Sequence, residues 1–172
     1  GTFGISTLWI SLAGKIPAFS ESMEIFEKMK YMYAYGGFLS IIVLPVLLAP
    51  VIEEIVFKGI VLRGLEKVKA GAFAVIVSAF LFGIGHMIPV QLVYTFIMGI
   101  ITGFVYVKRR SLIYPIAIHM TNNLLSSIEV AFPSGAKALD IIAVALIIPM
   151  GYLLYCMAKT KSDDKSRAVL CA

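Results

Sequence analysis

Long apolar stretches, separated by short polar or basic clusters, occupy most of the chain. A helix needs about 20 residues to cross the hydrocarbon core of a membrane. The stretches that approach this length are residues 35–52, 71–87, 90–107, 111–132 and 136–157. The first helix is expected to continue to Glu66, because prolines inside membrane helices are tolerated. The pattern predicts an all-α polytopic membrane protein with a bundle of about five to six transmembrane helices.

Residues 1–34 follow a different pattern and are predicted to form an N-terminal interfacial segment. Residues 1–17 are too short, and too broken by Gly and Pro, for a confident span, so they form either an interfacial stretch or the end of a truncated helix. Residues 20–30 mix Met, Ile and Phe with Glu and Lys, which is typical of a short amphipathic helix at a membrane surface. A transmembrane core (35–158) and a polar, disordered C-terminal tail (159–172) are expected to follow.

Composition supports the membrane assignment and excludes nucleic acid as a partner. Hydrophobic residues make up 60% of the chain, and the mean hydropathy of +0.94 exceeds that of a typical globular protein. The net charge is +5, yet the basic residues form short clusters between apolar runs, such as 108–110, instead of a continuous face. Such clusters mark the cytoplasmic ends of membrane helices. The C-terminus is therefore predicted to be cytoplasmic.

A few strongly polar residues interrupt the apolar stretches. Glu53 and Glu54 are adjacent, His86 and His119 are the only histidines of the chain, and Asn123 follows His119 by four positions. At about 1.5 Å per residue, these side chains reach overlapping depths in three separate helices. Unpaired polar groups are costly inside a membrane. We therefore expect the five side chains to meet in one hydrogen-bonded or water-filled site.

The spacing of these residues suggests a hydrolytic site. His119 and Asn123 face the same way on a helix, as do Glu54 and Lys58. Glu53 points about 100° away from Glu54, so the two carboxylates should have different roles. One could activate a water molecule while the other pairs with Lys58. A histidine and an asparagine that donate to one oxygen could stabilise an oxyanion.

Three short motifs resemble those of the CPBP family of intramembrane proteases, also called the CAAX protease and bacteriocin-processing or Abi family. That family has Glu-Glu-x-x-x-Arg, Phe-x-x-x-His and His-x-x-x-Asn on successive helices. The matching positions here are Glu53-Glu54 with Lys58, Phe82 with His86, and His119 with Asn123. The similarity covers about residues 45–125.

The resemblance implies an intramembrane endopeptidase that hydrolyses a membrane-associated peptide or a lipidated, CaaX-type protein tail. By motif position, Glu53 with His86 would activate the attacking water. His119 with Asn123 would form the oxyanion site, and Glu54 would support them. Prenylated protein or peptide substrates and the lipid bilayer are the partners that this reading implies.

The resemblance leaves the cofactor open, and we expect none. No HExxH motif is present, and the candidate ligands do not share one helix. The alternative is a zinc ion held by Glu53, His86 and His119.

Other functions and simpler structural interpretations compete with the protease. Lys58 stands where the family has arginine, which keeps the charge but loses the bidentate fork. This departure favours a non-catalytic bacteriocin-immunity or membrane scaffold protein. A transporter with a proton relay would need more polar residues along its path than the apolar stretches offer. The structural interpretations place Glu53 and Glu54 among headgroups, and use His119 and Asn123 only to join helices.

Overall fold

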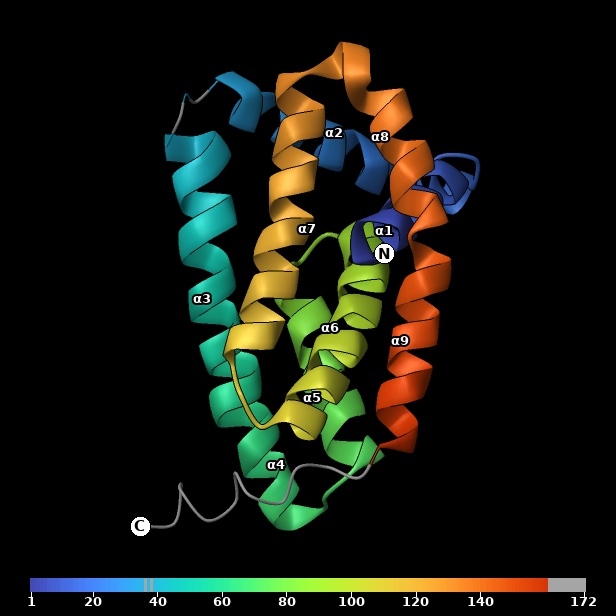
Figure 1. The fold of residues 1–172 in the computed structure, drawn as a ribbon. Coiled ribbons are helices and arrows are strands. Elements are labelled where there is room, and N and C mark those ends of the chain that lie inside the picture. Colours follow the sequence, from blue (N-terminus) through green and yellow to red (C-terminus); the bar gives the residue numbers. More distant parts are fainter. Residues whose placement is uncertain (36, 38, 161–172) are drawn as a thin grey trace.

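The computed structural model is an elongated bundle of helices, several of which run along its long axis (Figure 1). The structure describes residues 1–35, 37 and 39–160. Within these residues every regular element is helical, which confirms the predicted all-α polytopic membrane fold. Most of the tail predicted to be disordered, 161–172, lies outside the described residues.

One continuous helix spans Leu39–Val68 and carries both glutamates. It consists of a π-helical segment η2 (Leu39–Leu48), then α3 (Ala49–Glu54), a second π-helical segment η3 (Ile55–Leu62) and α4 (Arg63–Val68). Prolines lack the N–H that a regular helix uses, and two of them lie before the acidic pair. Widened π-helical turns are frequent near functional sites. The predicted continuation through the acidic pair is confirmed.

Helices α5 (Ala72–Gly85) and α6 (Pro89–Arg109) pack closely against each other. Small residues make this approach possible. A Cβ atom on Gly99 would lie 3.0 Å from Ala79, and one on Gly83 would lie 3.0 Å from a backbone carbonyl of α6. Close packing through small residues is typical of helices in membranes. This contact brings the C-terminal end of α5 against the N-terminal half of α6.

The remaining long helices are α7 (Ile113–Ala131), α8 (Pro133–Ala145) and α9 (Ile147–Lys159), with α7 between the Leu39–Val68 helix and the α8–α9 pair (Figure 1). Among the described residues, three helices are long and apolar enough to cross a membrane: Leu39–Val68, Pro89–Arg109 and Pro133–Lys159. The sequence predicted five such spans. Helix α5 is apolar but shorter, and polar side chains lower the hydropathy of α7.

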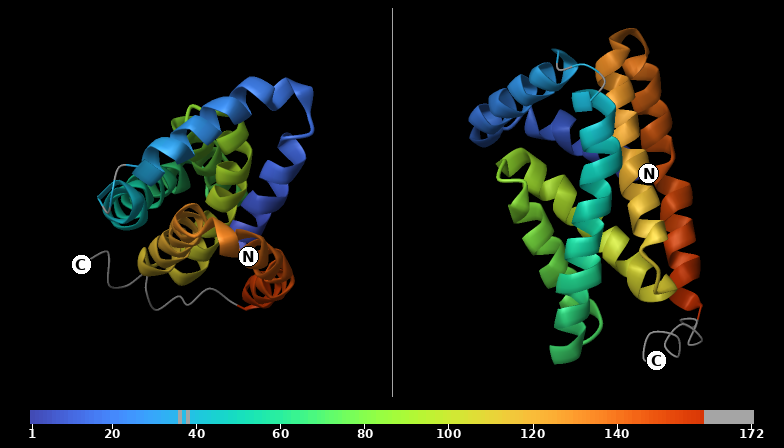
Figure 2. Two further views of the ribbon diagram at one scale, coloured as in Figure 1. Left: turned by 90° about the horizontal axis from the view of Figure 1, so that it is seen from above. Right: turned by 90° about the vertical axis from the view of Figure 1, so that its left-hand side faces the viewer.

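The N-terminal segment forms α1 (Thr2–Ala13), a short 3-10 turn η1 (Pro17–Phe19) and α2 (Ser20–Tyr35). Helix α2 crosses one end of the bundle, as the view from above shows (Figure 2). The amphipathic helix predicted at 20–30 is therefore present and longer than expected. Helix α1 does not lie loosely at a surface. It packs so tightly against α8 that a Cβ on Gly4 would overlap the backbone of Ala143.

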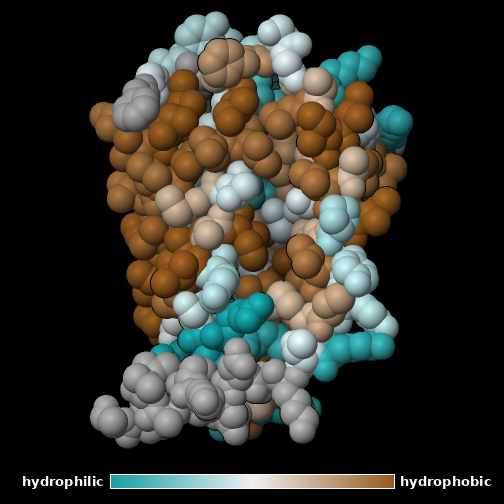
Figure 3. Space-filling model, viewed as in Figure 1, coloured by the Kyte–Doolittle hydropathy of each residue, from teal (hydrophilic) through white to brown (hydrophobic). Residues whose placement is uncertain are grey.

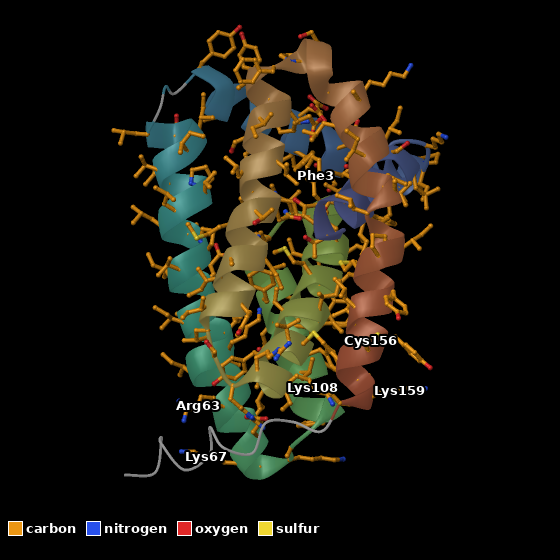
Figure 4. The ribbon with its side chains drawn as sticks, in the orientation of Figure 1. Phe3, Arg63, Lys67, Lys108, Cys156 and Lys159 are labelled. Carbon is orange, nitrogen blue, oxygen red and sulfur yellow. The ribbon has the colours of Figure 1, made fainter. Side chains whose placement is uncertain are left out.

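Basic residues gather at the end of the bundle opposite α2. Arg63, Lys67, Lys108 and Lys159 all lie there (Figure 4). Lys108 Nζ donates to the carbonyl oxygens of Ala158 and Thr160 at 3.1 and 3.0 Å, which satisfies the C-terminal end of α9. Hydrophobic residues cover much of the face above this basic end (Figure 3). The molecule thus has the apolar sides and the basic end of a membrane protein, while the cytoplasmic position of that end remains a prediction.

Candidate active site

Glu54 is the buried centre of an ion-pair network. Its carboxylate is fully buried, with Oε1 3.0 Å from Nδ1 of His119 and Oε2 3.2 Å from Nζ of Lys58. A carboxylate only accepts hydrogen bonds, so Nδ1 of His119 carries the proton. The predicted pairing of Glu54 with Lys58, four residues apart, is present. Lys58 thereby retains a contact to the acidic pair even though it cannot form the bidentate fork of arginine.

Glu53 approaches the other nitrogen of the same imidazole. Its Oε2 lies 3.8 Å from Nε2 of His119, beyond hydrogen-bond distance. Among the described residues, this oxygen has no hydrogen-bond partner. The Glu53 side chain keeps 30% of its surface exposed, whereas Glu54 keeps none. The two carboxylates therefore differ in their surroundings: Glu54 is enclosed and ion-paired with Lys58, whereas Glu53 is partly exposed and its buried Oε2 has no hydrogen-bond partner among the described residues.

The Phe82 ring packs against His86, His119 and Lys58. Its ring is fully buried and meets the rings of His86 and His119 edge-on, with centroids 4.9 and 5.6 Å apart. Nζ of Lys58 lies 4.4 Å from the centroid of the same ring, in a cation–π contact. The sequence analysis named Phe82 only as the first residue of the Phe-x-x-x-His motif. The structure shows that its packing partners are both histidines and the buried lysine.

His86 sits at the C-terminal end of α5 and is half-buried. Its Nδ1 lies 3.0 Å from the carbonyl oxygen of Phe82. Because a carbonyl only accepts, the Nδ1–H donates and a neutral His86 ring has an unprotonated Nε2. An unprotonated Nε2 is the form that can accept a proton from water.

Asn123 joins α7 to the helix that carries the glutamates. Its Nδ2 donates to the carbonyl oxygen of Pro45 at 2.7 Å. Pro50 lies five residues after Pro45 and lacks an N–H, so it cannot provide the π-type hydrogen bond to that carbonyl. The second N–H of the Asn123 amide is not used in this contact. Asn123 can therefore hold the helix and still donate to a ligand.

A cavity of about 600 Å³ connects four of the five candidate residues, Glu53, His86, His119 and Asn123. Glu54 does not line it and lies behind His119. Helices α1, α2 and α6 also line it. Their apolar lining residues include Phe3 (labelled in Figure 4), Ile10, Phe26, Met29 and Met98, and their polar ones include Ser6, Thr7, Lys30, Gln91 and Thr95. The cavity lining thus combines the four candidate residues with both apolar and polar side chains of the surrounding helices.

The alternative zinc site would need at least three ligand side chains close together in the described part of the chain. There, no group of three or more His, Cys, Asp or Glu side chains is placed to hold a metal ion. His119 uses Nδ1 for Glu54, and the three suggested ligands, Glu53, His86 and His119, share the cavity without forming a ligand set.

The sequence analysis missed the contribution of the N-terminal segment. Eight of the cavity-lining residues belong to α1 and α2: Phe3, Ser6, Thr7, Ile10, Ser11, Phe26, Met29 and Lys30. Lys30 also contacts Glu129 of α7 at 3.5 Å. The mixture of Ser and Thr with apolar residues in 1–17 was the available signal, but it does not say which surface the segment covers.

Comparison with known proteins identifies a matching family. The model of a family described as type II CAAX prenyl endopeptidase Rce1-like matches residues 35–125, which is more than half of the chain. No curated protein and no solved structure matched. The matched range contains all five candidate residues and excludes α1 and almost all of α2.

Proposed function

Because the chain belongs to the type II CAAX prenyl endopeptidase Rce1-like family, we propose that it is an intramembrane endopeptidase that hydrolyses a peptide bond by a glutamate-activated water. This membership confirms the family resemblance inferred from the three motifs. The observation that carries the mechanism is the single cavity lined by Glu53, His86, His119 and Asn123. The proposed substrate is a membrane-associated peptide or a prenylated, CaaX-type protein tail.

The first chemical step uses the open carboxylate and the free imidazole nitrogen. A water molecule between Glu53 and Nε2 of His86 gives its proton to the Glu53 carboxylate as its oxygen attacks the scissile carbonyl carbon. The unpaired Oε2 of Glu53 supports this role. The C–N bond then breaks, and the protonated Glu53 returns the proton to the leaving amine. No proton is gained or lost over the whole reaction.

The second requirement is a partner for the oxyanion that forms on the carbonyl oxygen. Asn123 offers the N–H that its bond to Pro45 does not use. His119, when both of its nitrogens carry protons, donates Nδ1–H to Glu54 and Nε2–H to the oxyanion. Glu54 and Lys58 fix the orientation of the His119 ring and do not touch the substrate.

The direct test is cleavage by the purified protein in phospholipid vesicles. The substrates are one peptide with a CaaX-type tail in its prenylated and unprenylated forms, and mass spectrometry identifies the products. We expect cleavage at one bond, with the prenylated form cut faster because apolar residues such as Phe3, Ile10 and Phe26 line part of the cavity. Empty vesicles are the control. Binding of the peptide without any cleavage would contradict the proposal and favour the non-catalytic scaffold.

A second experiment addresses the cofactor. We expect no metal to be required, so cleavage should persist in the presence of a strong zinc chelator. Loss of cleavage with the chelator, followed by recovery on adding zinc, would replace the metal-free mechanism with one in which Glu53, His86 and His119 bind zinc.

A further inference from the structure

Both N-terminal helices hold the backbone of one buried residue, Val90. Nε1 of Trp9 in α1 donates to the Val90 carbonyl oxygen at 2.8 Å. The Val90 N–H donates to Oγ of Ser22 in α2, also at 2.8 Å. Val90 is fully buried in an apolar cluster with Ala13 and Phe26. We call Trp9, Ser22 and Val90 the Val90 clamp.

The clamp lies directly beside the turn that carries His86. His86 ends α5, and Pro89 begins α6 three residues later. Between them, Met87 adopts a positive φ of 57°, which is uncommon for a side chain of this kind and persists only where the surroundings fix it. The Met87 side chain is 90% exposed, so its own packing does not fix the turn. The Met87 N–H bonds back to the Ile84 carbonyl oxygen at 2.9 Å, and Ile88 packs against the cluster that contains Val90. Val90 is the first fully buried residue after His86.

The first turn of α6 also depends on Ser22 for hydrogen bonding. The opening N–H groups of a helix have no partner within it, and a serine hydroxyl usually supplies one from the preceding residue in sequence. Here the position before α6 is Ile88, which makes no side-chain capping bond. The hydroxyl comes instead from Ser22, 68 residues away in the chain. Ser22 thus caps α6 from another helix.

We propose that Trp9 and Ser22 are positioning residues for His86: by holding Val90, they set the turn that presents the imidazole to the cavity. The inference rests on the proposed function, since it takes His86 as the group that activates water with Glu53. Both residues lie outside the matched range 35–125. The N-terminal helices therefore do more than close the cavity, because they align one of its reacting groups.

The kinetic test compares variants in the vesicle assay. Ser22→Ala removes the acceptor for the buried Val90 N–H and should lower kcat about tenfold, with KM within about twofold, since small misplacements of reacting groups slow catalysis strongly. Ser22→Thr keeps a hydroxyl and should restore kcat. Ser20→Ala, an exposed serine in the same helix, is the matched control and should leave both constants unchanged. An unchanged kcat in Ser22→Ala, or a change confined to KM, would overturn the proposal.

A second variant covers the case in which Ser22→Ala fails to fold. Trp9→Phe keeps an aromatic ring in the contact with Phe19 but removes the N–H that bonds to Val90. It should reduce kcat in the same direction as Ser22→Ala. Full activity in a folded Trp9→Phe protein would show that the Trp9 N–H does not help to position His86.

A measurement without turnover separates the clamp from the proposed function. The chain has two histidines, so NMR of protein labelled with ¹⁵N-histidine in detergent micelles gives two pairs of ring-nitrogen signals, one pair for each histidine, assigned with His86→Gln. Ser22→Ala and Trp9→Phe should shift the His86 signal and leave that of His119 in place. If the protein cleaves nothing but the His86 signal moves, only the proposed function fails. If the His86 signal does not move in either variant, the clamp fails, whatever the activity.

Discussion

The two histidines that line the cavity are held in different ways. His119 is almost fully buried, and side chains hold it: Glu54 at Nδ1, Glu53 near Nε2 and the edge of Phe82. His86 is half-buried at a helix end, its ring bonds to the backbone carbonyl oxygen of Phe82, and the Phe82 ring meets it edge-on. The first imidazole belongs to a network of buried charges, whereas the second depends on the backbone.

This difference implies that substitutions around His119 and substitutions at His86 have different consequences. A buried charge that loses its partner destabilises the fold strongly. A residue at a helix end can be replaced with little loss of stability, because few buried groups depend on it. We therefore expect changes around His119 to affect both folding and activity, and changes at His86 to affect activity almost alone.

The largest effects are expected from removing either imidazole. His119→Ala and His86→Ala should each lower kcat/KM by about 10²–10⁴-fold, the usual contribution of an acid–base or oxyanion group. Only His119→Ala should also lower the unfolding temperature, since it leaves Oε1 of the buried Glu54 without its hydrogen bond. Kinetics and thermal unfolding in the same detergent test this contrast, and equal losses of stability in both variants would break it.

The next effect concerns Lys58. Lys58→Met leaves the buried Glu54 carboxylate without its cation and should destabilise the protein by about 3–5 kcal/mol. Lys58→Arg retains the charge and should lose much less stability. Denaturant unfolding of the three proteins measures the difference. A Lys58→Met protein as stable as the wild type would show that the network around His119 does not contribute to the fold.

A smaller effect is expected from Asn123. Asn123→Ala should cost about 1–3 kcal/mol, because the Pro45 carbonyl loses its donor. It should also reduce kcat if the second N–H contacts the oxyanion. Asn123→Asp provides the comparison, since it retains the size of the side chain but has no N–H. A loss of stability without any loss of kcat would confine Asn123 to joining the helices.

The smallest effect is expected from the ion pair between α2 and α7. Lys30→Met removes the contact between α2 and Glu129 of α7 and should cost less than about 1 kcal/mol, as partly exposed ion pairs contribute little. Lys28→Met on the exposed side of the same helix is the control. A large loss in Lys30→Met alone would mean that the position of α2, and with it the turn of His86, depends on this ion pair.

The sequence predicted an all-α membrane fold and the grouping of the polar residues in apolar helices, four of which line one cavity, because both follow from short-range rules. Apolar length and helical spacing locate the helices, and Glu54 with Lys58 at four residues apart form the expected ion pair. Polar residues in apolar helices seek each other, so the meeting of Glu53 with His119 was foreseeable. The sequence analysis did not predict that both glutamates approach the His119 ring. Helix geometry gives only the direction in which each side chain leaves the helix, and two side chains that point in different directions can still reach the two nitrogens of one histidine.

The role of the N-terminal segment could not be predicted in the same way. Helix α1 has 12 residues and no clear polar face, and its position depends on Gly4 meeting Ala143 far along the chain. The bonds of Trp9 and Ser22 to Val90 likewise join residues distant in sequence. Periodicity shows which residues of a helix are apolar. It does not show with which distant backbone groups the side chains of the helix will form hydrogen bonds.

The central claim is that the open carboxylate of Glu53 activates the attacking water, and one comparison tests it most directly. The rate of cleavage of the prenylated tail peptide is measured for the wild type, Glu53→Gln and the exposed control Glu21→Gln in the same vesicles. Glu53→Gln should be slower by about 10³-fold or more, while Glu21→Gln matches the wild type. Turnover by Glu53→Gln within about twofold of the wild type would contradict the account.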